Sequence, residues 1–393
     1  MKNNVDKQYI DCLKYILDNG IKKTDRTGTG TLSVFDLSMR FKMSEGFPLL
    51  TSKKMFLKGI IHELIWFLNG DTNIKYLIDN DTHIWDGDAY KKYDKITKKY
   101  SGCCPECGEG YQNDKDGENN DICICGNDKK SSKLSIKEFV SKIKTDPDFA
   151  KIWGELGPVY GKQWTDWGGH TEFVEVGGYH YGGSFGGAVH KVGGEMKELY
   201  IKGINQIQNL INDLKTNPDS RRLIVSAWNV GEINQMTLPP CHFGFQCYTF
   251  ELTFEERLQY WLTSLGKSKY YGEGINDEDL DRLNIPKRYL ILKWFQRSCD
   301  FPLGIPYNIA SYGILLHLLA KEVNMIPYEL IFNGGDCHIY LNQVEGVKKQ
   351  LTQETFELPK LLLNNNSLRE LKYEDVKIVD YKSSPTVKFP LSN

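Results

Sequence analysis

The chain has 393 residues, of which 40% are hydrophobic, and a formal net charge of −2 at pH 7. This length allows a large core, and the nearly balanced charge argues against a protein that binds nucleic acid through a broad basic surface. No apolar run reaches the roughly 18 residues of a membrane span, and the first residues lack the apolar centre of a signal peptide. We therefore expect a cytoplasmic protein whose ten cysteines are thiols or metal ligands rather than disulfides.

Hydrophobic periodicity predicts alternating helices and strands. The predicted elements, in chain order, are a helix at 7–19, a strand at 31–42, a buried helix at 57–69, strands at 222–228 and 243–250, and a second buried helix at 309–323. Because strands interleave with long apolar helices, the sequence predicts the α+β class, with one large mixed or antiparallel sheet packed with helices.

Three segments interrupt this pattern. Residues 99–133 are polar and rich in cysteine, residues 168–194 are rich in glycine and aromatic side chains, and residues 252–288 are charged and predicted to be helical. Segments of this length without a predicted core are usually functional loops or disordered. We predict one catalytic domain over 1–393 with these three segments as surface insertions.

Two short motifs indicate covalent chemistry. Residues 238–242 read Leu-Pro-Pro-Cys-His, and the two prolines would hold Cys241 in a rigid loop. Residues 296–308 combine a guanidinium, a hydroxyl, a carboxylate and an amide within one stretch. Together they predict an enzyme that attacks a small phosphorylated substrate with sulfur, although a buried structural role remains the alternative for any single cysteine.

Longer motifs give the chain a family resemblance. They are Asp25–Gly30, Trp66–Thr72, Ile84–Asp86, Gly157–Trp164, Ser220–Asn229, Leu238–His242, Gln296–Asp300 and Gly335–Tyr340. In this order the chain resembles thymidylate synthase and its viral relatives, the deoxypyrimidine hydroxymethylases. The resemblance implies the thymidylate synthase fold, a homodimer that packs sheet to sheet, and the host cytoplasm as compartment if the chain is viral.

The resemblance also implies the reaction, in which a one-carbon unit passes from 5,10-methylenetetrahydrofolate to C5 of dUMP. Cys241 is the implied nucleophile, and its addition to C6 makes C5 reactive. Glu63 is implied to organise water and proton transfer, and Tyr160 to help remove the C5 proton. Asp300 matches the residue that pairs with the pterin ring, and Trp85 and Gly304 are further folate-binding positions.

Substrate contacts are carried over in the same way. Arg26, Gln296, Arg297 and Ser298 are implied to bind dUMP from one subunit, while Arg221 and Arg222 reach the phosphate from the partner. Asn308 is implied to read O4 and N3 of uracil, and His338 and Tyr340 to hold the 3′-hydroxyl. A solvated surface position is the alternative for the arginine pair, and an ordinary helix-start residue is the alternative for Asn308.

The product depends on whether hydride or water captures the methylene intermediate. The polar terminal Asn393, the acidic Asp88, and the length and insertions favour water, as in a phage deoxyuridylate hydroxymethylase that makes 5-hydroxymethyl-dUMP. Trp85, Asn308 and Leu391 favour the alternative, a thymidylate synthase that makes dTMP and dihydrofolate. A third alternative is a non-catalytic regulator that binds nucleotide or RNA, and we expect neither a DNA nor a membrane partner.

The cysteine-rich insertion predicts a structural zinc ion. Cys104 and Cys107 form one pair followed by glycine, and Cys123 and Cys125 form a second pair followed by glycine. Two such pairs are typical of a small zinc ribbon, although the second pair has one intervening residue instead of two. The alternative is a loop of thiols without metal.

Overall fold

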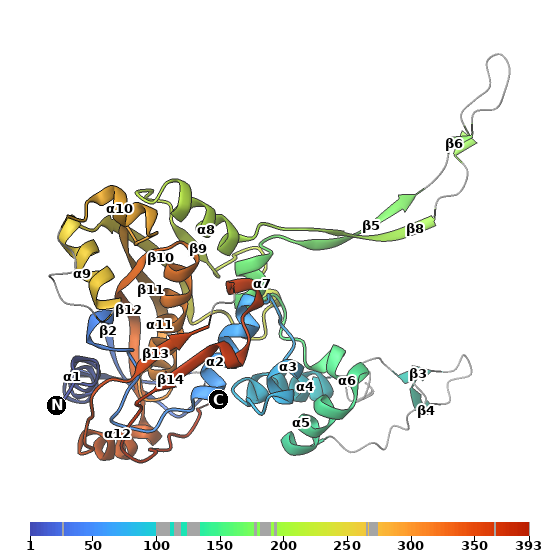
Figure 1. Cartoon of the computed structure of the whole chain (residues 1–393). Coiled ribbons are helices and arrows are strands. Elements are labelled where there is room, and N and C mark those ends of the chain that lie inside the picture. The colour runs from blue at the N-terminus through green and yellow to red at the C-terminus, as the bar shows by residue number, and fades with distance from the viewer. Residues whose placement is uncertain are drawn as a thin grey trace.

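A computed structural model describes residues 1–25, 27–99, 111–113, 119–123, 134–176, 179–180, 190–191, 195–264, 266, 274–364 and 367–392. Its centre is a six-stranded sheet in the order β1-β2-β12-β11-β10-β9 (Figure 1). These strands are β1 (Ile21–Lys23), β2 (Thr31–Lys42), β9 (Ile224–Ser226), β10 (His242–Glu251), β11 (Arg288–Asp300) and β12 (Ile326–Tyr340). Since β11 and β12 run parallel and their neighbours antiparallel, the sheet is mixed, which confirms the predicted fold class.

The remaining strands pair outside this sheet. Four two-stranded sheets are formed by β13 (Lys360–Leu363) with β14 (Val376–Val379), β3 (Tyr111–Asn113) with β4 (Asn119–Cys123), β5 (His170–Val176) with β8 (Glu195–Ile201), and β6 (Tyr179–His180) with β7 (His190–Lys191). Strand β5 lies within the predicted glycine-rich insertion at 168–194, and β8 follows directly after it. Figure 1 shows the β5–β8 ribbon extending far from the large sheet. Its base is fixed by Asp166, which accepts hydrogen bonds from the Tyr200 hydroxyl and the Gly203 amide.

The helices pack on the large sheet and on one another. They are α1 (Asn4–Asn19), α2 (Leu57–Leu68), α3 (Lys75–Asp79), α4 (Asp86–Lys99), α5 (Ile136–Thr145), α6 (Pro147–Trp153), α7 (Tyr160–Thr165), α8 (Gln206–Thr216), α9 (Phe254–Ser264), α10 (Asp277–Arg282), α11 (Gly304–Glu322) and α12 (Val344–Leu351). α11 packs on β11, β12 and α2, so most of its side chains are buried. Among the described helices, none has both the length and the apolar content needed to cross a membrane.

Several predicted boundaries differ from the structure, and α1, for example, begins at Asn4 rather than at 7. Helix α11 begins at Gly304 rather than at 309. Pro306 is tolerated there, because the first turn of a helix needs no amide donor. The Leu303 amide, directly before the helix, donates to Asp300. Strand β9 covers 224–226 rather than 222–228, since its pairing with β10 stops at Ser226.

The described part of the charged segment 252–288 includes helices α9 and α10. Arg257 of α9 is 5% exposed and forms ion pairs of 2.6 Å with Asp277 and 2.7 Å with Asp281 of α10. A buried guanidinium needs such partners, so the charges that mark this segment in the sequence join its two helices.

A buried hydrogen-bond cluster joins both ends of the chain. Asp6 of α1 is fully buried and accepts hydrogen bonds from the Thr51 amide and hydroxyl and from the Ser52 amide. The Thr51 carbonyl in turn accepts from the Ser384 amide, and Asn3 donates to the Phe356 carbonyl. The segment that leads into α2 is therefore held by the first and the last parts of the chain.

Candidate functional site

Cys241 sits in a fixed loop directly before β10. Its amide donates to the Tyr160 hydroxyl at 2.7 Å, and its carbonyl accepts from the Arg297 amide at 2.8 Å. The Arg297 guanidinium donates to the Pro240 carbonyl at 3.0 Å and the Pro239 carbonyl at 2.9 Å. The two prolines restrict the loop, and one arginine from β11 holds it on the sheet. The sequence predicted this rigidity, but it assigned Arg297 to the substrate phosphate alone.

Aromatic residues surround the base of this loop. Tyr160 is 2% exposed and stacks on His242 with ring centroids 4.2 Å apart. Burial and the neighbouring Cys241 raise the pKa of Tyr160 well above its ordinary value, so it remains a phenol. Burial lowers the pKa of His242 to about 3, and its Nδ1 lies 2.9 Å from the Tyr312 hydroxyl. His242 therefore stays neutral and supports the loop.

Glu63 places a carboxyl group within the apolar helix α2. It is 8% exposed, and Oε1 accepts a hydrogen bond of 2.9 Å from the Trp85 indole. Burial raises its pKa to about 7, while the Trp85 hydrogen bond opposes this shift. Near neutral pH the group is therefore able to both give and take a proton. Trp85 itself is 6% exposed and packs against Trp66 and Tyr160, so its contacts in this structure orient Glu63.

Asp300 ends β11 and is linked to the C-terminal tail. Its carboxylate accepts from the Leu303 amide at 3.1 Å and from Gln343 Nε2 at 3.2 Å, and burial raises its pKa. Gln343 also donates to the Pro390 carbonyl at 3.1 Å. Lys53, which is 3% exposed, donates to the Pro302 carbonyl, and burial lowers its pKa to about 7. The sequence analysis missed both Gln343 and Lys53, since neither lies in a motif that marks it.

Asn308, Gly304 and Asp300 lie together at the start of α11. A Cβ built on Gly304 would lie 3.9 Å from both Asn308 Oδ1 and Asp300 Cβ, so the absence of a side chain leaves room between the amide and the carboxylate. His338 and Tyr340 follow on β12 with ring centroids 5.2 Å apart, and the His338 carbonyl accepts from the Phe301 amide. The structure thus brings the predicted base-reading and sugar-binding residues to neighbouring strand ends.

Gln296 is placed differently from the expectation. It is 3% exposed, its Nε2 donates to the Ser298 carbonyl, and its Oε1 accepts from the Trp294 indole. Both ends of the amide are used within β11, so these contacts indicate support of the strand, and a direct contact with substrate stays a prediction.

Arg221 and Arg222 lie far from Cys241 of the same chain. Both are exposed in the turn before β9, where the Leu223 carbonyl accepts from the Cys247 amide. Cys247 is six residues beyond Cys241 along an extended strand, a separation of about 20 Å. Neither arginine side chain spans that distance, so within one chain the structure does not bring this pair to the cysteine.

Several predicted positions lie outside the described residues. Arg26 is one of them, although Asp25 closes its loop by accepting from the Thr27 and Gly30 amides at 2.8 Å. Cys104, Cys107 and Cys125 are also outside the described part of the chain, and only the backbone of Cys123 is described, in β4. Among the residues that the structure describes, no group of three or more His, Cys, Asp or Glu side chains could hold a metal ion. The zinc site stays a prediction.

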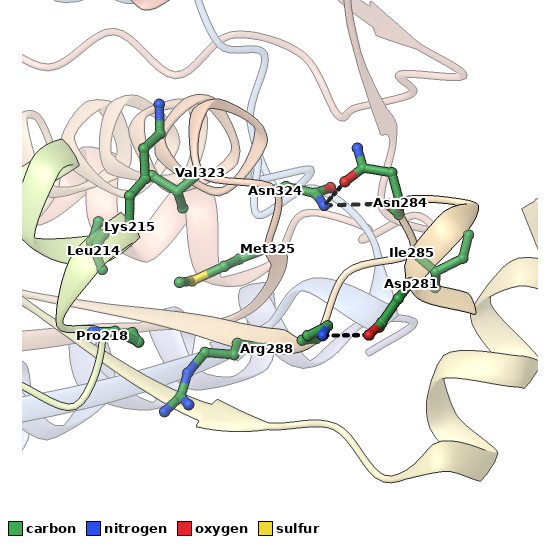
Figure 2. Close-up of a pocket in the computed structure, with 11 residues that line it drawn as sticks. Leu214, Lys215, Pro218, Asp281, Asn284, Ile285, Arg288, Val323, Asn324 and Met325 are labelled. Carbon is green, nitrogen blue, oxygen red and sulfur yellow. Dashed lines mark hydrogen bonds and ion pairs between the residues drawn. The ribbon is translucent and has the colours of Figure 1, made fainter. Parts of the chain in front are cut away.

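A separate pocket lies at the opposite end of β11. It has a volume of about 280 Å³ and is lined by the end of α8, the segment between α10 and β11, and the turn before β12 (Figure 2). Asn324 donates to Asn284 across its rim, and Lys287 pairs with Asp281 at 2.7 Å. None of the predicted site residues lines this pocket.

Comparisons with known proteins agree with the motifs. A family model described as thymidylate synthase matches residues 7–393. A protein named thymidylate synthase from Mycoplasma mobile is 38% identical over 97% of this chain and 98% of its own length. Proteins with the same name from Malacoplasma penetrans and Listeria innocua serovar 6a are each 36% identical, over 97% and 98% of this chain and 98% and 99% of their own lengths.

Proposed function

The chain belongs to the thymidylate synthase family, and from that premise we propose that it makes dTMP and dihydrofolate from dUMP and 5,10-methylenetetrahydrofolate. The observation that carries the proposal is the Cys241 loop, held by Tyr160 and Arg297 beside the buried carboxyl group of Glu63. The shared name of the relatives supports this product over 5-hydroxymethyl-dUMP, which the sequence analysis favoured.

The proposed steps use the described residues in order. The Cys241 thiolate adds to C6 of dUMP, and the resulting nucleophilic C5 attacks the folate methylene carbon. Tyr160 assists loss of the C5 proton, and Glu63 exchanges protons with the pyrimidine carbonyl and the folate. Tetrahydrofolate then leaves the C5 methylene group and returns a hydride to it, which expels the thiolate and leaves dTMP and dihydrofolate.

The tail supports hydride transfer over capture by water. The polar Ser392 is only 7% exposed, and its hydroxyl lies 3.1 Å from Asn342 Nδ2. Phe389 packs against Gly346 and beneath Lys53, and Pro390 is bound by Gln343. Through Ser392 the tail is therefore docked, and its hydroxyl is satisfied by protein. The inference of a wetter site rested on Asp88 and on Asn393, which lies outside the described residues, so these contacts concern only the part of the tail before Asn393.

Product analysis tests the choice. Purified protein with dUMP and methylenetetrahydrofolate is expected to release dihydrofolate and thymidylate in equal amounts. Dihydrofolate is measured by its absorbance, and thymidylate is identified by its mass. A product heavier than thymidylate by one oxygen, with tetrahydrofolate as co-product, would instead support the hydroxymethylase. Binding of dUMP without any turnover would support the non-catalytic alternative.

We also propose a homodimer in which Arg221 and Arg222 complete the partner's site. The sheet face opposite the helices carries Ile224, which is 53% exposed, and Tyr248, which is 63% exposed. Ile224 lies in register with Gln246 and therefore on the same side of the sheet as Tyr248. An uncovered face with large apolar side chains supports packing of two sheets, and a twofold axis would bring the arginines to the other subunit.

Subunit mixing tests this arrangement. Cys241→Ser and Arg222→Ala homodimers are each expected to be nearly inactive. After random exchange of the two, half of the dimers combine both variants and contain one intact site out of two. The mixture should then recover about a quarter of wild-type activity. A mixture that stays inactive would place Arg222 in its own chain's site or outside the site.

Base choice is tested at Asn308. An amide is able to accept from N3–H of uracil and donate to O4, whereas a protonated carboxyl group suits cytosine. Asn308→Asp is expected to lower kcat/KM for dUMP by about tenfold or more and to raise that for dCMP. Wild-type protein that already prefers dCMP would contradict the proposed role of Asn308.

The domain organisation is part of the same proposal. We propose a single catalytic domain over 1–393 with insertions at 99–133, 168–194 and 252–288. One cluster of buried apolar residues that extends from α1 to β14 and includes α5 and α6 supports it.

A further inference from the structure

Asp336 is a polar residue that contacts the proposed site but has no part in the steps above. It lies on β12 two residues before His338, so both side chains point to the same side of the strand. Its Oδ1 accepts from the Ser33 hydroxyl at 2.7 Å and lies 3.1 Å from His338 Nδ1, while Oδ2 accepts from Lys23 Nζ at 3.3 Å.

These contacts define the tautomer of His338. Nδ1 faces two acceptors, the Asp336 carboxylate at 3.1 Å and the Asp336 carbonyl at 3.2 Å. A ring nitrogen between two acceptors carries the proton, so neutral His338 presents an unprotonated Nε2. That nitrogen is an acceptor, and the group it suits is a hydroxyl donor such as the 3′-hydroxyl of the nucleotide.

A purely structural role explains these contacts poorly. The Asp336–Lys23 ion pair is substantially exposed, and such pairs contribute little to stability. By contrast, the two donors on Oδ1 belong to the buried residues Ser33 and His338, which are 3% and 7% exposed. The His338 hydrogen bond is also the main reason that the pKa of Asp336 lies well below its ordinary value, which keeps the carboxylate an acceptor.

We propose that Asp336 is a positioning residue for the sugar: it fixes the orientation and tautomer of His338, so that Nε2 accepts the 3′-hydroxyl of dUMP. Ser33 and Lys23 hold the carboxylate in place from β2 and β1. The proposal rests on the proposed function, because it assumes that dUMP binds at His338.

The test compares dUMP with 2′,3′-dideoxyuridine 5′-monophosphate, which lacks the 3′-hydroxyl. Asp336→Ala is expected to lower kcat/KM for dUMP by about tenfold, mainly through KM, and to change that for the dideoxy nucleotide less than twofold. Asp336→Asn keeps an acceptor oxygen for Nδ1 and should recover much of the preference for dUMP. The control is Glu329→Gln. Glu329 lies on β12, like Asp336, but its carboxylate pairs with Arg40 of β2, so this variant should leave the preference for dUMP over the dideoxy nucleotide unchanged.

Calorimetric binding of both nucleotides to the wild-type protein comes first and separates two kinds of failure. If the wild type does not bind dUMP, the proposed function is wrong. If the wild type binds dUMP, but Asp336→Ala lowers the affinity for both nucleotides equally or for neither of them, the proposed function stands and the positioning role of Asp336 is overturned. A loss confined to dUMP supports the proposal.

Discussion

Replacing Cys241 by serine is expected to reduce kcat by at least about a thousandfold and to abolish covalent capture of the nucleotide. A hydroxyl is far less acidic than a thiol, and neither Tyr160, which remains a phenol, nor His242, a neutral and buried ring, would ionise it. The measurement uses 5-fluoro-dUMP with methylenetetrahydrofolate, because fluorine cannot leave C5 as a proton does. Mass spectrometry of the denatured protein should show one adduct per chain in the wild type and none in Cys241→Ser.

The matched control is Cys12→Ser. Cys12 is half-buried, like Cys241, but it lies on α1, and burial raises the pKa of its thiol to about 12. That variant should keep both turnover and the adduct. If Cys241→Ser protein still formed the adduct, the nucleophile would be another residue, and the interpretation of the Cys241 loop would be wrong.

Glu63→Gln is expected to change activity and stability in opposite directions. Glutamine keeps an acceptor for the Trp85 indole but cannot exchange a proton, so kcat should fall by about 100-fold or more. The folded-state pKa of about 7 exceeds the ordinary value of 4.5, so between these pH values the folded chain binds more protons than the unfolded chain. Wild-type stability should therefore fall as pH rises from about 4.5 to about 7, and the full difference corresponds to about 3 kcal/mol.

Glutamine has no such titration. In urea unfolding at a series of pH values, Glu63→Gln should equal the wild type near pH 4.5 and exceed it by up to about 3 kcal/mol at pH 8. Asp6→Asn is a useful comparison, since Asp6 is also a buried carboxylate but accepts several hydrogen bonds from Asn3, Thr51 and Ser52. Its replacement should destabilise the protein. Equal stability of Glu63→Gln and wild type at pH 8 would show that Glu63 is not held in a costly environment.

Regular elements with strong patterns were predictable from the sequence. The alternation over 31–42 and the apolar helix at 57–69 agree closely with β2 and α2. The start of α11 was missed because Gly304 and Pro306 are typical of a loop, whereas in the structure the helix begins at Gly304, directly after the Leu303 amide donates to Asp300. The β5–β8 ribbon was not predicted, because the glycine-rich sequence that separates its two strands led us to assign residues 168–194 to a single insertion, although neither strand contains glycine.

The residues of the candidate site also differ in how far the sequence predicts them. Cys241, Glu63, Asn308 and His338 stand in recognisable motifs, and the resemblance assigned them residue by residue. Lys53 and Gln343 were missed, because each gains its role through contact with a distant segment rather than through its neighbours in sequence. Asp336 lies within the Gly335–Tyr340 motif, but the motif alone does not show that its carboxylate contacts His338 and is held by Ser33 and Lys23. Gln296 is the converse case, a motif residue whose amide is used inside its own strand.

The cluster at Asp6, Thr51 and Ser384 has a consequence for how the protein is made. Strand β2 pairs with β12, which is synthesised almost 300 residues later, and the segment that reaches Asp300 through Gln343 is synthesised later still. During translation the nascent chain cannot complete the central sheet or close the site until nearly all of it has left the ribosome. Pairing between such distant segments also slows folding, since the entropy of closing a long loop is lost before the contacts form. Until then β2 exposes an unpaired edge, and chaperones would meet the chain at that stage.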